Sequence, residues 1–234
     1  MRLNWNNDFE KGLLKPAIVI ALITILNACT STKIDEHVQR PERAEISSED
    51  AVVVLGRRHN SDYETEPDFI NCIGSRLANG DPGFRLISET EFMNSLYPWF
   101  EPRTAPMAMN RFASLMEMPS FEQRVRDMKL KYVIWVDGST ERVDSMGSIS
   151  CAVGPGGAGC LGFGSWQDDA TYEASIWDVH QLQQVANVSA NAEGTSYMPA
   201  FVVPIPLIAR VQASACEGLG KQLQTLFVEG AITE

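Results

Sequence analysis

Short apolar runs and helix signals alternate along the first half of the chain, and this order restricts its fold more than any other feature. Residues 51–55, 84–87 and 132–136 are short runs of mostly apolar side chains, and each predicts a strand. Between them, residues 65–80 and 88–97 carry apolar side chains at helical spacing. The order of strand, helix, strand, helix and strand predicts a sheet with helical crossovers on it.

Both predicted helices begin at a capping signal. Thr65 and Ser88 are hydroxyl residues, and each is followed three positions later by an acidic side chain, as in a capping box. Gly80 marks the end of the first helix. Residues 112–116 and 121–128 also show helical spacing, which adds helical segments before the third strand.

The second half of the chain has a different pattern. Residues 139–165 are rich in Gly and Ser, whereas residues 170–179 and 185–195 alternate apolar and polar side chains. This alternation predicts an antiparallel hairpin with one buried face and one wet face. Residues 205–227 predict a final amphipathic helix. We therefore expect an α/β (α+β) fold: a single mixed sheet with helices packed on it, ending in the hairpin and a C-terminal helix.

An apolar run near the N-terminus reads as a secretion signal. Residues 17–26 are apolar, follow Lys11 and Lys15, and are too few to span a bilayer comfortably. The Leu-Asn-Ala-Cys sequence that ends at Cys29 resembles the bacterial lipobox, whose cysteine is acylated when the leader is removed. The resemblance implies a lipoprotein signal peptide at 1–28 and a lipid, of the palmitate type, on Cys29.

The segment that follows predicts how the folded part is attached. Residues 29–50 are polar and charged without apolar periodicity, which is typical of a flexible tether. Thr30, in place of the Asp that retains such lipoproteins at the inner membrane, implies the outer membrane. We expect residues 51–234 to form a single α/β domain in the periplasm, held at the membrane by acyl chains.

Four cysteines remain besides Cys29, an even number in an exported and oxidising setting. They allow three pairings. Cys151 and Cys160 flank a glycine-rich stretch whose closure costs little, and we favour this pair. The second disulfide would then join Cys72 to Cys216 and connect an early helix to the last one.

Charge and motifs exclude several functions. The formal net charge of −11 argues against nucleic acid as the main partner. No Cys-x-x-Cys occurs and the three histidines are scattered, so we expect no metal site. We also expect no cofactor, because the glycines at 154, 156 and 159 follow no strand and precede no helix. A serine hydrolase would need His59 or His180 placed beside a carboxylate, and nothing local orients either.

The most distinctive stretch is residues 97–106, which concentrate three aromatics, three prolines, a Glu and an Arg. Proline excludes regular structure there, so the aromatics are expected on a stiff loop. Such a loop is typical of a protein-binding hot spot. The alternative is that Trp99 and Phe100 fold back and cover the edge of the sheet. The candidate partner-binding residues are Tyr97, Trp99, Phe100, Glu101 and Arg103.

The leader, the order of elements, the later hairpin and the terminal helix resemble exported lipoproteins related to the curli-secretion channel and the penicillin-binding-protein activators. These share a small α/β domain similar to the N-terminal domain of the Tol-system propeller protein. The resemblance covers roughly residues 50–228 and is architectural, so no functional residue carries over. Residues 132–137 and 175–179 also look like pieces of an uncharacterised bacterial outer-membrane lipoprotein family.

Members of the broader group bind protein partners or oligomerise, which implies a non-enzymatic role. We therefore expect an accessory or assembly factor of the envelope that acts by protein–protein binding or self-association. One alternative is an envelope hydrolase or small-ligand-binding protein, which a cleft joining a histidine to carboxylates would favour. Another is an oligomeric secretion-channel component, although alanines and Asp178 weaken the apolar stripe of the hairpin at 170–195.

Overall fold

A computed structural model of the chain describes residues 32–39, 44, 46–47, 49–59, 63–80, 84–101, 104–106 and 108–231. The chain divides into two compact units. The described part of unit 1 is Thr32, Arg142–Asp168 and Gly194–Ala209, and unit 2 holds the other described residues. The segment 51–234, expected as one domain, thus contributes to both units.

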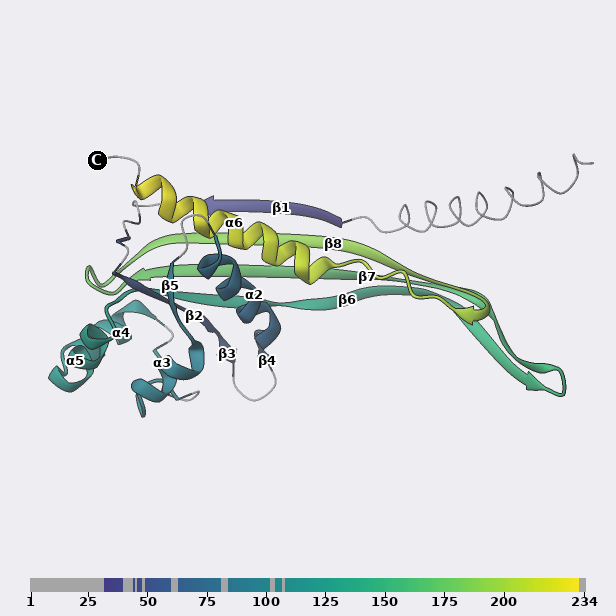
Figure 1. The fold of residues 1–234 in the computed structure, drawn as a ribbon, viewed down its shortest axis with the longest axis horizontal. Helices are drawn as coiled ribbons and strands as arrows, with labels where there is room; N and C mark the ends of the chain where they lie inside the picture. The colour runs from purple at the N-terminus through teal and green to yellow at the C-terminus, as the bar shows by residue number, and fades with distance from the viewer. Residues whose placement is uncertain are drawn as a thin grey trace, which may run out of the picture. The chain divides into compact units, whose positions relative to one another are not determined.

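A six-stranded sheet runs in the order β1-β8-β7-β6-β2-β5 (Figure 1). Its strands are β1 (Thr32–Gln39), β2 (Ala51–Gly56), β5 (Arg85–Ile87), β6 (Leu130–Gly154), β7 (Gly157–Asp178) and β8 (Gln183–Pro204). β2 pairs in parallel with β5 and with β6. A separate antiparallel ladder joins β3 (Arg58–His59) to β4 (Tyr63–Glu64). The predicted fold, a mixed sheet with helices packed on it, is confirmed.

The predicted hairpin is present, and its buried face is the one expected. Tyr172, Ala174 and Ile176 of β7 are fully buried, as are Ala186 and Ala190 of β8. The strands are much longer than the alternation indicated, because residues 139–154 continue β6 and residues 157–169 belong to β7. The Gly- and Ser-rich stretch is therefore a β-hairpin. Its side chains are mostly exposed, so burial imposes no alternating pattern on them.

Residues 32–39, predicted as part of the tether, form β1 beside β8. This corrects the expectation for that stretch. A strand at the edge of a sheet is held by backbone hydrogen bonds to its one neighbour, and it needs no apolar periodicity.

Helices cover both faces of the sheet in unit 2. On one face lie α2 (Pro67–Ala78) and α6 (Val211–Ala231), which pack against each other (Figure 1). Phe69 of α2 stacks on Tyr172 of β7, with 3.5 Å between ring centroids. The other helices are α3 (Glu89–Ser95), α4 (Met109–Met116) and α5 (Pro119–Asp127), whose phenylalanines join a buried cluster with Trp135 and Trp177.

Helix boundaries follow the sequence signals in part. Ser88 caps α3 as predicted, and its hydroxyl oxygen accepts a hydrogen bond from the backbone N–H of Glu91 at 3.2 Å. Thr65 is not the N-cap of α2, a position that Glu66 occupies. The Thr65 hydroxyl instead donates to the buried carbonyl of Val136 at 3.1 Å. The last helix begins at Val211 rather than at 205, because the backbone of Leu207 pairs with Tyr197.

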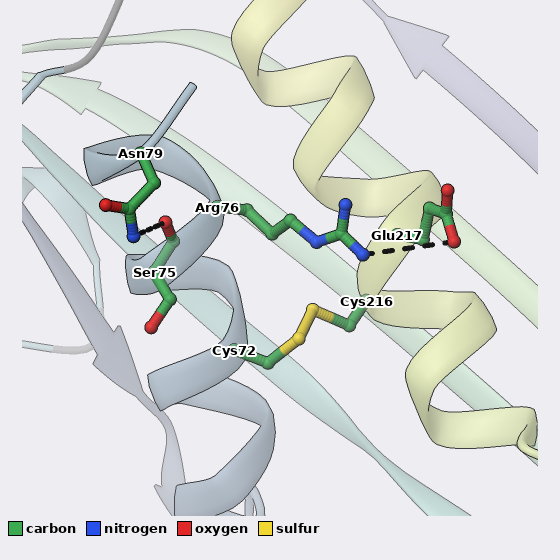
Figure 2. The surroundings of a disulfide bond; sticks show 6 residues. All are labelled: Cys72, Ser75, Arg76, Asn79, Cys216 and Glu217. Atoms are coloured by element: carbon green, nitrogen blue, oxygen red, sulfur yellow. Dashed lines mark hydrogen bonds and ion pairs between the residues drawn. A yellow bond between two sulfur atoms is a disulfide. The ribbon is translucent and has the colours of Figure 1, made fainter.

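Both predicted disulfides are present. Cys72 of α2 bonds to Cys216 of α6 across a sequence separation of 144 residues, as Figure 2 shows. Beside it, the Arg76 guanidinium faces the Glu217 carboxylate at 3.9 Å. Cys151 and Cys160 are joined across the β6–β7 hairpin, with 4.0 Å between their Cα atoms. The first disulfide ties two helices of unit 2, and the second closes the hairpin of unit 1.

Candidate functional site

The predicted binding loop follows α3, and its three aromatic residues have different surroundings. Tyr97 is 61% exposed. Trp99 is half-buried and packs edge-on against Phe121, with 5.4 Å between centroids. Phe100 is only 2% exposed, between Phe92 and the cluster around Trp135. Phe100 is therefore a core residue and is removed from the candidate surface, since a buried ring offers no contact area.

The backbone of this loop is held by side chains from outside it as well as within it. The Thr104 hydroxyl donates to the Pro98 carbonyl at 2.8 Å. Arg124 of α5 donates to the carbonyl of Ser95 at 2.8 Å and to that of Tyr97 at 3.4 Å. These bonds fix the chain on both sides of Tyr97, which is therefore displayed on an ordered support.

The arginine beside the loop is not the one predicted. Arg103 lies outside the described residues. The guanidinium of Arg124 lies over the Trp99 ring, 5.4 Å from its centroid. Glu101 is exposed, and its carbonyl accepts the backbone N–H groups of Thr104 and Ala105. We define the Tyr97 surface as Tyr97, Trp99, Glu101 and Arg124. Sequence reasoning missed Arg124 because α5 brings it to the loop from a distant segment.

A cleft of about 730 Å³ in unit 2 brings a histidine to carboxylates. His180, in the turn between β7 and β8, lines it together with Glu49, Asp50, Glu117 and Glu122. Its apolar lining includes Met116, Val125, Leu130, Val179 and Leu182. No local pattern in the sequence predicts this cleft, because its walls come from distant stretches of the chain, residues 47–50, 113–130 and 179–182.

Two ion pairs lie along the cleft. Lys129 and Glu49 are 2.6 Å apart, and Arg126 and Glu122 are 3.0 Å apart. The hydrogen bond from Lys129, and then its charge, hold the pKa of the Glu49 carboxyl below its usual value. The backbone N–H of Ser47 donates to the Asp50 carboxylate at 2.8 Å. Within the described residues, no three His, Cys, Asp or Glu side chains are grouped to hold a metal ion.

Unit 1 exposes apolar side chains. We define the arm as residues 142–168 and 194–209, which are the parts of β6, β7 and β8 that belong to unit 1, with the short segment after β8. Among the described residues, the large apolar side chains that are exposed outside the arm are Tyr97 and Leu182 alone. Those exposed within it include Met146, Val153, Leu161, Phe163, Phe201 and Val202.

Glycines let the two hairpin strands of the arm approach closely. Gly147 has a φ of 96°, and a Cβ added there would lie 2.2 Å from the carbonyl oxygen of Phe163. Gly162 has a φ of 149°, and a Cβ there would lie 2.3 Å from the carbonyl oxygen of Ser148. Both positions therefore require glycine, which explains part of the unusual composition of this stretch.

Cys29, the predicted lipid attachment site, lies outside the described residues. So does the leader at 1–28, and the side chains of His37 and His59 are likewise not described. Across the described part of the chain, no helix is both long enough and apolar enough to cross a membrane.

The sequence matches no protein-family model and no curated protein. In structure the chain is similar to chains of the PelC dodecamer from Paraburkholderia phytofirmans. One such structure, of a variant, aligns at a TM-score of 0.36 and 15% identity over 82% of this chain and 98% of that one. The second structure aligns at a TM-score of 0.36 and 13% identity over 82% of this chain and 97% of that one.

Proposed function

We propose that this chain is a non-enzymatic accessory protein of the bacterial envelope, anchored by a lipid on Cys29, that acts by binding another envelope protein. One observation carries the proposal: Tyr97 exposes 61% of its surface on a backbone held by Arg124 and Thr104. A large aromatic side chain on an ordered support loses little entropy on binding, and such residues dominate protein interfaces.

The chemistry around Tyr97 supports a protein partner. Trp99 is half-buried beneath Arg124, and Glu101 is exposed next to them. Tyrosine, tryptophan and arginine are the residues most enriched at binding hot spots. The two disulfides support an oxidising compartment, which agrees with a periplasmic domain on the outer membrane.

The test is crosslinking in cells of the full-length chain, followed by mass spectrometry of the proteins recovered with it. We expect one envelope protein to be recovered with the unchanged chain, and Tyr97→Ala to lower its recovery about tenfold. Leu182→Ala is the control, because Leu182 is an exposed apolar residue that lines the His180 cleft and lies outside the Tyr97 surface. If a folded Tyr97→Ala variant recovers the envelope protein as well as the unchanged chain does, the Tyr97 surface is not the binding site. The same conclusion follows if Leu182→Ala lowers the recovery equally.

The cleft beside His180 favours a second candidate function, binding or hydrolysis of a small ligand. The observation behind it is that His180 and four carboxylates line one space of about 730 Å³. The test is hydrolysis of p-nitrophenyl acetate by the purified chain. A hydrolysis rate above background would support an enzyme if His180→Ala abolishes it and Tyr97→Ala leaves it intact. A rate equal to background would count against hydrolysis at this cleft.

A further inference from the structure

The arm combines exposed apolar side chains with an absence of charge. No Asp, Glu, Lys or Arg occurs from residue 145 to 165 or from 194 to 209. The whole chain, by contrast, carries 30 acidic and 19 basic side chains. Phe201 is 78% exposed and Leu161 is 68% exposed. From this we propose that the arm binds the surface of a lipid bilayer.

The charged residues of the arm are Arg142, Asp144 and Asp168, which lie near the two ends of the segment 142–168 in the sequence. Arg142 and Asp168 form an ion pair at 3.2 Å, near the ends of the uncharged hairpin. Between them lies Trp166, whose ring faces the Arg142 guanidinium at 5.1 Å and whose indole N–H donates to Asp168 at 3.0 Å. A tryptophan that joins an apolar surface to polar groups is typical of the boundary between hydrocarbon and lipid headgroups.

Apolar exposure runs through consecutive positions. Phe201, Val202 and Val203 are 78%, 67% and 62% exposed. A protein that docked on one face of the arm would leave part of this run in water, whereas the fluid interfacial layer of a bilayer adapts to side chains that point in different directions. The consecutive exposure therefore favours lipid over a protein partner.

Backbone hydrogen bonding indicates how deep the arm lies. β7 lies between β6 and β8 in the sheet, so it has a neighbouring strand on each side. β2 ends at Gly56, opposite Val136, and does not reach the part of β6 that belongs to the arm. In the described part of the chain no other strand lies along this edge of β6, so its backbone groups there need water or headgroups as hydrogen-bonding partners, because an unpaired backbone group is costly in hydrocarbon. The arm therefore lies in the interfacial layer.

The charge distribution also selects the lipid class. The uncharged stretches hold no Lys or Arg that would attract anionic headgroups, and the chain as a whole carries a net charge of −11. Anionic membranes would repel it. The arm fits a zwitterionic surface such as phosphatidylcholine, with binding that does not weaken at high salt, since apolar burial supplies the free energy.

The experiment is photo-crosslinking with benzoylphenylalanine in the full chain, at Leu161 or Phe201 of the arm. Tyr97 and Leu182 are the control positions, because they are exposed apolar residues of unit 2 in the same anchored chain. The probes are vesicles of phosphatidylcholine, alone or mixed with phosphatidylglycerol, and mass spectrometry identifies each adduct. We expect about tenfold more lipid adduct at the arm than at the controls, undiminished at high salt and lower with phosphatidylglycerol.

Equal lipid adducts at all four positions would show proximity through the anchor alone and overturn the proposal. The proposal would also be overturned if Leu161 and Phe201 gave protein adducts instead of lipid adducts, or gave no adduct. Charge insertion gives an independent measurement: Val153→Lys should lower the lipid adduct at Phe201 about tenfold, whereas Leu182→Lys should not. Val153 is 87% exposed, so this variant keeps the folded chain intact. The inference stands apart from the proposed function, because the Tyr97 surface belongs to unit 2.

Discussion

The guanidinium of Arg124 lies 5.4 Å from the centroid of the Trp99 ring. The same side chain donates to the carbonyl oxygens of Ser95 and Tyr97. One residue of α5 therefore orders a loop more than twenty positions earlier in the chain. We expect Arg124→Ala to lower the free energy of unfolding by about 1 kcal/mol, because it removes an exposed cation–π contact and two hydrogen bonds. Urea denaturation measures this change.

Arg126 provides the control for Arg124, since both are exposed arginines of α5. Arg126 pairs with Glu122 at 3.0 Å, one helical turn away, and such a pair contributes about 0.3–0.5 kcal/mol. Arg126→Ala should therefore change stability and partner recovery less than Arg124→Ala does. Equal effects of the two substitutions would show that Arg124 does not order the loop.

The two disulfides should differ in their contribution to stability. In the entropic model, the stabilisation grows with the length of the loop that a disulfide closes. The Cys72–Cys216 pair spans 144 residues and the Cys151–Cys160 pair spans 9, so the model gives about 5 and about 3 kcal/mol. We expect the Cys72→Ala, Cys216→Ala double variant to unfold at lower urea than the Cys151→Ala, Cys160→Ala variant. The reverse order would contradict this.

Tyr172 should make stability sensitive to alkaline pH. Burial raises the pKa of its hydroxyl to about 12, Glu66 adds to the increase, and hydrogen bonds with Thr140 and Gln212 partly oppose it. The folded pKa lies above the ordinary value of 10.0, so the folded chain keeps the proton longer than the unfolded chain. Its contribution to stability is complete below pH 10 and is lost between about pH 10 and 12.

Urea denaturation from pH 8 to 11.5 measures the effect of Tyr172. Tyr172→Phe should be less stable than the unchanged chain at pH 8, because it leaves the Glu66 carboxylate without the 3.0 Å hydrogen bond from the hydroxyl. The difference between the two chains should shrink as the pH rises above 10. A difference that stays constant would show that Tyr172 does not titrate in this range.

Asp178 is a buried carboxylate on which a turn depends. It is 1% exposed, pairs with Lys131 at 3.3 Å, and accepts the backbone N–H groups of His180 and Gln181 at 2.8 Å. Asp178→Ala should destabilise the fold by about 3 kcal/mol, because it leaves a cation and two N–H groups unpaired. Asp178→Asn keeps an acceptor oxygen and should cost less. Thermal unfolding of both variants measures this, and equal losses would contradict it.

Local sequence patterns predicted the elements that neighbouring residues define. The buried face at Tyr172, Ala174 and Ile176 follows from alternation, because successive side chains of a strand point to opposite faces. Ser88 predicted the start of α3, because a hydroxyl and the N–H three residues later meet within one turn. The disulfide pairing followed from the glycine-rich spacing between Cys151 and Cys160, which left Cys72 and Cys216 as the second pair.

The sequence by itself thus determined the order of the main strands and helices and the buried face of the hairpin, because these depend on periodicity. It favoured the disulfide pairing that the structure shows, because the short spacing between Cys151 and Cys160 made their pairing easy. Only the tertiary structure placed Phe100 in the core, Arg124 over Trp99 and His180 in a cleft with carboxylates. Exposure of a side chain depends on elements that lie far apart in the chain. Strand pairing in the arm depends on backbone hydrogen bonds, which leave no periodic pattern when both faces are exposed.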